Sequence, residues 1–196
     1  MFPFTRSECP AWLVDCWENM GIRFRDAKTR NPAYQFHWYK KFNQPESLRL
    51  LLEMTNYHCA FCDGGFLGAE SRKTIEHFRP KSLYQTLAFQ WENLYPCCDQ
   101  CQSAKGERFD EQLLVGDLPD YYFERYFCLD YVSGALLPNP LASEEDQQRA
   151  AVTLRIYGLN LYERKRARIF QRRLYECRTA DMELDDFSYR YFLMDA

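Results

Sequence analysis

The sequence predicts an α-rich α+β protein in which mostly helical N- and C-terminal flanks surround a short, zinc-stapled central segment. Apolar residues recur at helical spacings in the first and last thirds of the 196 residues. The central third instead holds two Cys-x-x-Cys pairs and a short run of strand-forming residues. These observations divide the chain into a helical flank 1–55, a central module 56–110, and a mainly helical region 111–196 with a basic helix and an acidic tail.

Three helices are expected in the N-terminal flank. Pro10 is well placed to open the first, and Gly21 to end it. A second is expected from Asn31, as N-cap, to Phe42, and a third is expected to begin near Pro45. Their apolar stripes predict a core built on the flank.

Two more helices are expected in the C-terminal region. Ser143 and Asp146 have the spacing of a capping box, and that helix should run to about Tyr157, before Gly158. The next begins near Leu161 and is expected to bury one face, formed by Ala167, Phe170, Leu174 and Cys177.

Charge and aromatic residues are unevenly distributed although the net charge is only −3. Residues 160–178 hold seven Lys or Arg against two Glu, which predicts a solvated face or a track for DNA phosphates. Residues 181–195 hold five acids against one Arg. The aromatic run 121–127 suits either a core or a protein interface. No apolar run approaches the ~20 residues of a membrane span, and no signal-peptide pattern opens the chain, so we expect a cytoplasmic protein.

Four of the nine cysteines predict a structural zinc site. Cys59 and Cys62 form one Cys-x-x-Cys pair, Cys98 and Cys101 form another, and 35 residues separate the two pairs. This spacing lets two tight turns supply four thiolates to one tetrahedral Zn²⁺. Cys97 fits the spacing less well. The remaining four cysteines, Cys9, Cys16, Cys128 and Cys177, are expected to be small buried hydrophobes.

A strand and a short helix are expected between and after these pairs. The strand covers Lys73 to Arg79, where Pro80 disfavours helix for the preceding residue. The helix opens near Cys101 and stops at Gly106. His77 lies at the strand end, whereas His37 and His58 are expected to be structural.

This arrangement resembles the HNH nuclease motif over Cys59 to Phe109, with Glu76-His77 on the strand, Asn93 sixteen residues later and Gln102 nine further on. The runs 74–82 and 93–106 resemble more closely the HNH nuclease of the Septu and retron-associated antiphage systems. The resemblance implies a ββα-metal module that hydrolyses DNA phosphodiester bonds.

The resemblance also implies a role for each residue. His77 would be the general base, with loss of activity below roughly pH 6, where an ordinary imidazole protonates. Glu76 would bind catalytic Mg²⁺ or Mn²⁺, although it points to the opposite strand face from His77. Asn93 would orient the base. Gln102 stands where the family has a His or Asn metal ligand, which is a departure.

Phosphates and a partner complete the expectation. Arg79 and Lys105, with Lys81, are available to phosphates. By resemblance the partner is an ABC-type ATPase that gates the nuclease. Two alternatives stay open: a non-catalytic zinc-ribbon adaptor that binds nucleic acid or protein, and a free-standing nuclease.

Overall fold

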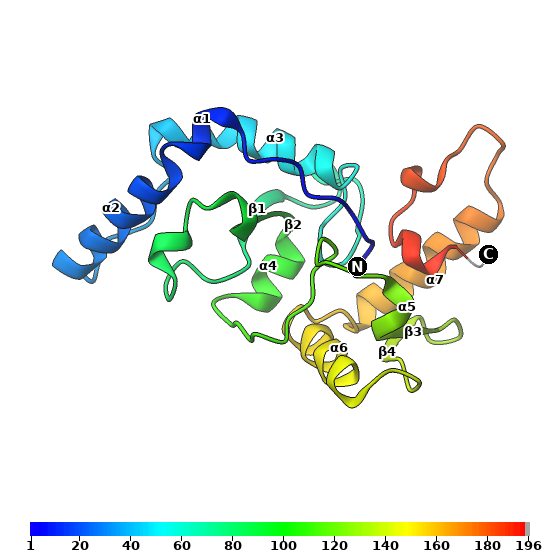
Figure 1. Cartoon of the computed structure of the whole chain (residues 1–196). Helices are drawn as coiled ribbons and strands as arrows, with labels where there is room; N and C mark the ends of the chain where they lie inside the picture. The colour runs from blue at the N-terminus through cyan, green and yellow to red at the C-terminus, as the bar shows by residue number, and fades with distance from the viewer. Residues whose placement is uncertain (195–196) are drawn as a thin grey trace.

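The computed structural model describes residues 1–194 and has a mixed α+β architecture with two separate two-stranded antiparallel sheets. Figure 1 shows α1 to α3 arching over the first sheet, with α4 below it and α5 to α7 gathered around the second sheet. No helix among these residues is both long and apolar enough to cross a membrane. In chain order the elements are α1 (Ala11–Val14), α2 (Trp17–Arg30), α3 (Gln44–Met54), β1 (Lys73–His77), β2 (Leu94–Cys98), α4 (Asp99–Lys105), α5 (Phe123–Tyr126), β3 (Phe127–Asp130), β4 (Ala135–Pro138), α6 (Glu144–Ile156) and α7 (Tyr162–Glu176).

The first sheet confirms the predicted strand. β1 pairs with β2 in a register that runs from Lys73 opposite Cys98 to His77 opposite Leu94. Because side chains alternate along a strand, His77 faces the aromatic rings of the N-terminal flank while Glu76 faces α4. The expected opposition of these two side chains is therefore confirmed.

Two hydrophobic cores lie on either side of this sheet. The N-terminal core takes Ile75 and Leu94 from the sheet and adds buried residues of α1 to α3, whereas the other core takes Tyr95 and Cys97. Strand β1 is thus packed from both directions, which fixes the position of the residues at its end.

The start of the chain belongs to the second core. Met1 is fully buried there, its carbonyl accepts a hydrogen bond from the Tyr121 hydroxyl at 3.1 Å, and the Phe4 amide donates to Gly116 at 3.1 Å. Figure 1 shows the N-terminal segment running from α1 to the neighbourhood of α5. The predicted three-part division stays a prediction, since residues of ranges 1–55 and 111–196 share one core.

The N-terminal helices differ from the expectation in three places. The helix expected from Pro10 is broken at residues 15–16 into α1 and α2. Gly21 does not end a helix, because α2 continues through it to Arg30. Its missing side chain instead allows contact with a neighbouring segment, since a Cβ there would lie 2.1 Å from the Thr86 carbonyl oxygen. The helix expected from Asn31 to Phe42 is absent, and only a 3₁₀ turn, Lys40–Phe42, forms. The third helix is confirmed as α3.

The aromatic residues of the segment 31–39 contact one another and the end of β1 instead of following a helical stripe. Phe36 packs edge-on against Trp38, with ring centroids 4.9 Å apart, and Trp38 stacks on Phe42 at 4.3 Å. His37 is exposed and off any helix, with the Tyr34 hydroxyl 3.3 Å from its Nδ1. Tertiary contacts between rings here outweigh the helical spacing of the apolar residues.

Helix α6 confirms its predicted cap. The Ser143 hydroxyl accepts a hydrogen bond from the Asp146 amide at 3.1 Å, and the helix ends before Tyr157. The return half of the capping box is not made, because the Asp146 carboxylate accepts from Arg125 at 3.0 Å.

Helix α7 forms as expected, but it does not bury the face that the sequence predicts. Phe170 and Leu174 are 59% and 43% exposed and Cys177 is also exposed, whereas Arg164 and Arg168 are buried. The Arg168 guanidinium donates to three oxygens in the core, those of Gly134, Leu159 and the Asn160 side chain. The basic run is therefore not one solvated or DNA-facing surface, because two of its arginines are core residues.

Most of the aromatic run 121–127, between the central module and the C-terminal helices, packs into the core. Tyr121, Phe123, Tyr126 and Phe127 are buried, and Tyr122 alone of the predicted set is exposed. The core alternative is confirmed for those four residues. Of the four cysteines expected to be buried, Cys177 is exposed and the other three are partly exposed.

Candidate metal centre and active site

The four predicted cysteines come together as a buried cluster. The sulfurs of Cys59, Cys62, Cys98 and Cys101 all lie within 4.8 Å of one another, and those of Cys62 and Cys98 are 3.7 Å apart. Four sulfurs at 2.3 Å from a tetrahedral zinc ion are separated by about 3.8 Å. The cluster therefore has the donor set and the spacing that could bind a zinc ion.

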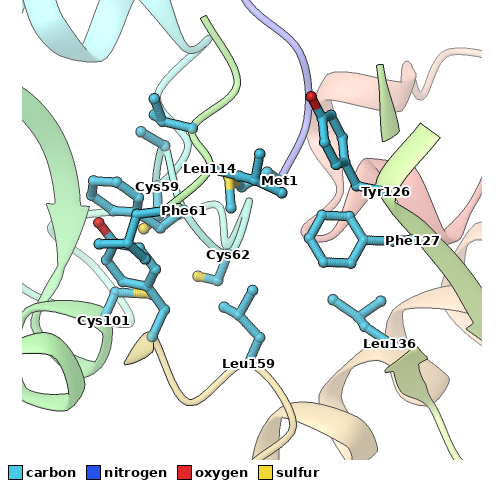
Figure 2. Packing of buried hydrophobic residues seen from close by; sticks show 14 of the residues in the cluster. Met1, Cys59, Phe61, Cys62, Cys101, Leu114, Tyr126, Phe127, Leu136 and Leu159 are labelled. Atoms are coloured by element: carbon cyan, nitrogen blue, oxygen red, sulfur yellow. The ribbon is translucent and has the colours of Figure 1, made fainter. Parts of the chain in front are cut away.

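Local backbone geometry holds the sulfurs in place. Cys98 is the N-cap of α4 and its sulfur accepts from the Cys101 amide at 3.4 Å, while the sulfur of Cys62 accepts from the Gly64 amide at 3.4 Å. Figure 2 shows three of the cysteines within a shell of apolar side chains that includes Phe61, Leu114 and Leu159. This shell excludes water from the thiolates.

A buried arginine from α7 supports an anionic cluster. The Arg164 Nη1 donates to the Cys101 sulfur at 3.1 Å, and its Nε and Nη2 are buried without a hydrogen-bond partner. Four thiolates around one divalent cation carry a net charge of about −2, which offsets the cost of burying a guanidinium. Burial alone would lower the pKa of Arg164, but the negative charge of Cys101 and Cys62 raises it above its usual range.

The neighbouring Cys97 is outside the cluster of four. Hydrogen bonding, first from Cys101, lowers the pKa of Cys98 to about 5, whereas burial raises the pKa of Cys97 well above its usual value. The Cys97 thiol donates to the Cys98 carbonyl at 3.2 Å. His58 is also outside it, with Nδ1 and Nε2 facing the carbonyls of Asn56 and Phe187.

A polar cavity of about 330 Å³ opens beside the end of β1. Glu76 and His77 of the strand line one side, Gln102 of α4 lines another, and the loops close it with Pro80, Lys81, Gly106 and Glu107. The cavity therefore gathers three of the four residues that the sequence predicts for catalysis, and the fourth, Asn93, is buried and does not line it.

His77 is held from three directions. Its Nε2 lies 3.0 Å from the Ala88 carbonyl, Trp38 stacks on the ring at 5.4 Å, and Phe36 packs against it edge-on at 5.3 Å. A carbonyl oxygen only accepts, so Nε2 carries the proton and Nδ1 is left as the basic nitrogen. Burial, and then the positive charge of Lys81, lower the pKa of His77 to about 3.

Asn93 braces the loop that contacts His77. Its side-chain oxygen accepts from the Arg79 amide at 2.7 Å, and its nitrogen donates to the carbonyls of Arg79 and Leu87, each at 3.1 Å. Leu87 precedes Ala88, whose carbonyl holds the imidazole. Asn93 thus joins the end of β1 to the loop that orients the His77 ring.

Glu76 forms a buried ion pair with Lys105. The Lys105 ammonium lies 2.8 Å from Glu76 Oε1 and 2.9 Å from the His77 carbonyl, and the two side chains are 0% and 7% exposed. Burial raises the pKa of Glu76 against the opposing effect of Lys105. The ammonium is therefore not displayed to solvent as a phosphate-binding cation would be.

Gln102 turns its amide nitrogen toward the strand. That nitrogen lies 3.4 Å from the Ile75 carbonyl, and hydrogen bonding by Gln102 also favours the ionised form of Glu76. The cavity therefore offers a divalent cation two carboxylates. Glu76 is already paired with the Lys105 ammonium, and Glu107 accepts a hydrogen bond from the Ser82 hydroxyl. Among residues 1–194, the four cysteines are the one group of three or more His, Cys, Asp or Glu side chains whose donor atoms converge.

Arg79 does not line the cavity. Its guanidinium forms a two-pronged ion pair with Glu111 at 2.7 and 2.8 Å and packs over the rings of Phe109 and Tyr84. The sequence interpretation did not foresee this pair. It also missed that Lys105 pairs with Glu76, although its spacing of three from Gln102 places both on one side of a short helix.

The comparisons with known proteins give a partial match. No family model matches the chain. Over 56 residues, 29% of this chain and 22% of the relative, the sequence is 39% identical to the Septu protein PtuB of Bacillus thuringiensis. The match spans about a fifth of that relative's length, and it supports a PtuB-like relationship for part of this chain.

Proposed function

We propose that the protein is an HNH endonuclease that hydrolyses DNA phosphodiester bonds with the help of Mg²⁺ or Mn²⁺, and that it acts in antiphage defence. The observation that carries the proposal is the cavity at the end of β1, where an imidazole held by a carbonyl leaves Nδ1 available as a base. The resemblance to Septu PtuB supports the defence role.

In the proposed reaction, His77 Nδ1 takes a proton from the attacking water. Its pKa of about 3 keeps the ring in the neutral, proton-accepting form at neutral pH and in mild acid. The same low pKa makes His77 a weaker base than an ordinary imidazole, whose pKa lies nearer the working pH. The expectation that activity declines near pH 6 through His77 is revised accordingly. Asn93 acts as a positioning residue through the 85–88 loop.

Cationic groups beside the cavity would oppose the developing phosphorane charge. Lys81 lines the cavity and its ammonium lies 5.3 Å from the Phe36 ring centroid. When bound, a divalent cation would supply charge neutralisation to the phosphate, with Glu76 as its protein carboxylate. The zinc site would hold α4 and β2 in place and take no part in the reaction.

A second candidate is the non-catalytic zinc-ribbon adaptor. The pairing of Glu76 with Lys105 and the inward turn of the Gln102 amide favour it, because neither group is presented as a free metal ligand. It predicts binding of nucleic acid or protein without cleavage.

Incubating supercoiled plasmid with pure protein and Mg²⁺ separates these functions. We expect nicked or linear product from wild type and about 10²-fold slower cleavage from His77→Ala. His37→Ala is the matched control, since this histidine is exposed and does not line the cavity. Equal cleavage by wild type and His77→Ala would remove the imidazole from the mechanism. A matched RNA substrate tests the choice of DNA.

The proposed partner is an ABC-type ATPase that gates the nuclease. Its support is the resemblance alone, because four residues of the aromatic run once considered for this interface are buried in the core. Co-expression with an ATPase encoded beside this protein should give one complex on size exclusion. Separate elution, with undiminished plasmid cleavage by the isolated protein, would favour the free-standing nuclease.

A further inference from the structure

The cation nearest to the proposed metal-binding carboxylate is one of the protein's own. Lys105 Nζ donates to Glu76 Oε1 at 2.8 Å and to the His77 carbonyl at 2.9 Å. Both groups border the space where the proposed reaction would occur. The Lys105 side chain is 0% exposed and does not itself line the cavity, but its two bonds tie it to the two strand residues that do.

A divalent cation and this ammonium compete for one carboxylate. Mg²⁺ and Mn²⁺ require several oxygen ligands in close contact, and the cavity offers Glu76 as its carboxylate on β1. A second positive charge a few ångströms from the ammonium would be repelled strongly in this buried setting. A divalent cation that binds Oε1 of Glu76 therefore takes the place that the Lys105 ammonium holds in this structure.

The residues next to Lys105 leave open space and a second carboxylate that the ammonium could occupy after it leaves Glu76. Lysine carries its charge on a flexible four-carbon stem. Lys105 is the last residue of α4, and the next residues, Gly106 and Glu107, themselves line the cavity. Gly106 has no heavy atom within 4 Å of where a Cβ would lie, and Glu107 presents a second carboxylate.

We propose that Lys105 is a displaceable cation that gates divalent-metal binding at Glu76. In the closed arrangement the ammonium satisfies the carboxylate, and in the open one the metal ion replaces it. The apparent affinity for the metal is then reduced by the fraction of molecules in which the pair is open. The inference rests on the proposed function in one respect, the assignment of Glu76 as a metal ligand.

Mn²⁺ binding to zinc-loaded protein without nucleic acid tests the gate, by electron paramagnetic resonance at pH 7.5. Lys105→Met should bind Mn²⁺ with a dissociation constant about tenfold or more below that of wild type, since the competitor is gone. Lys105→Arg keeps the charge and should stay within about threefold of wild type. Adding Glu76→Gln to Lys105→Met should abolish the gain.

Lys81→Met is the matched control for general electrostatics. Lys81 lines the same cavity, so its neutralisation also removes one positive charge, but Lys105 remains bonded to Glu76. We expect a change below about threefold. An equal gain in Lys81→Met and Lys105→Met, or a gain that survives Glu76→Gln, would overturn the gate.

A measurement on wild type covers the case in which Lys105→Met fails to fold. The buried ammonium should give a protected ¹⁵Nζ signal that is lost as Mg²⁺ saturates its site. A signal that persists at saturation would refute displacement. Because neither experiment uses nucleic acid, a failed gate and failed plasmid cleavage are separate results.

Discussion

At the end of β1, burial sets the protonation of His77. The ring stacks on Trp38 and its Nε2 is occupied by the Ala88 carbonyl, so adding a proton at Nδ1 would bury a charge. Its folded-state pKa of about 3 lies below the ordinary value near 6.5. The unfolded chain therefore binds this proton more readily than the folded chain does.

This difference predicts a pH-dependent stability. The contribution of His77 to the free energy of unfolding is complete above about pH 6.5 and declines as pH falls toward 3, with a loss of about 2 kcal/mol by pH 5. Urea unfolding at pH 7.5 and 5 should show a steeper decline for wild type than for His77→Gln. Parallel declines in the two proteins would contradict the burial argument.

The contact between Arg164 and Cys101 leads to a prediction about the affinity of the cysteine cluster for zinc. Losing a group that contacts a metal ligand typically costs 10–100-fold in affinity. Arg164→Met, which removes the donor to Cys101, should therefore release zinc to a chromogenic chelator about tenfold faster or more. Arg164→Lys should lie between, and Arg173→Met, on the exposed side of α7, should match wild type. Unchanged release from Arg164→Met would make the arginine a packing residue only.

Single residues were predictable where spacing alone decides the outcome. The four cysteines follow from two Cys-x-x-Cys pairs, and Cys97 was correctly set aside. The partners of Glu76 and Arg79 were not predictable, because Lys105 and Glu111 lie 29 and 32 residues away along the chain. Such contacts depend on the packing of α4 and its following loop against β1.

Among the elements, α2 shows how a close approach replaces a helix end. It crosses the 3₁₀ turn Gln85–Leu87 at Gly21, where the Thr86 carbonyl occupies the place of a side chain. Gly21 is therefore a position of close backbone contact between two segments and not the C-cap of a helix. Helix α7 gives the parallel lesson, because its arginines satisfy carbonyls in the core while Phe170 stays exposed.

The close approach predicts an inverted effect of Gly21→Ala. Alanine inside a helix is normally about 1 kcal/mol more favourable than glycine, but here its Cβ would overlap backbone atoms. We expect a net loss of about 1–3 kcal/mol of unfolding free energy in urea. Asn19→Ala, on the exposed side of the same helix, should be neutral or slightly stabilising. A stabilised Gly21→Ala protein would show that the two segments separate easily.

At the scale of the whole molecule, the four-cysteine cluster lies within a core that contains residues from both the first and the last part of the described chain. Its sulfurs share a hydrophobic cluster with Met1, Leu136 and Tyr191. We expect Cys98→Ala to lose zinc and tertiary structure, measured by metal analysis and near-ultraviolet circular dichroism, because structural zinc contributes folding energy directly. Cys97→Ala should keep both. A folded, zinc-free Cys98→Ala protein would contradict this role.

The α+β class, strand β1 and the helices α3, α4, α6 and α7 were predictable because they depend on local spacing, caps and prolines. The packing of the first sheet between two hydrophobic cores was not predictable from the sequence. It arises from Ile75, Leu94, Tyr95 and Cys97 pointing to opposite sides of a pair of strands that are buried almost throughout. A strand buried on both faces carries no alternation that could reveal which neighbour lies on which side.

The burial of Met1 has a consequence for the order in which the protein matures on the ribosome. Tyr121, which donates a hydrogen bond to the Met1 carbonyl, lies 120 residues later in the sequence. Asp63 forms a buried ion pair with Arg190, which lies 127 residues later. Contacts between such distant residues form only after both have emerged from the exit tunnel. The four clustered cysteines emerge earlier, so they could bind a zinc ion before the residues that cover them have been synthesised. Metal capture would then precede closure of the core.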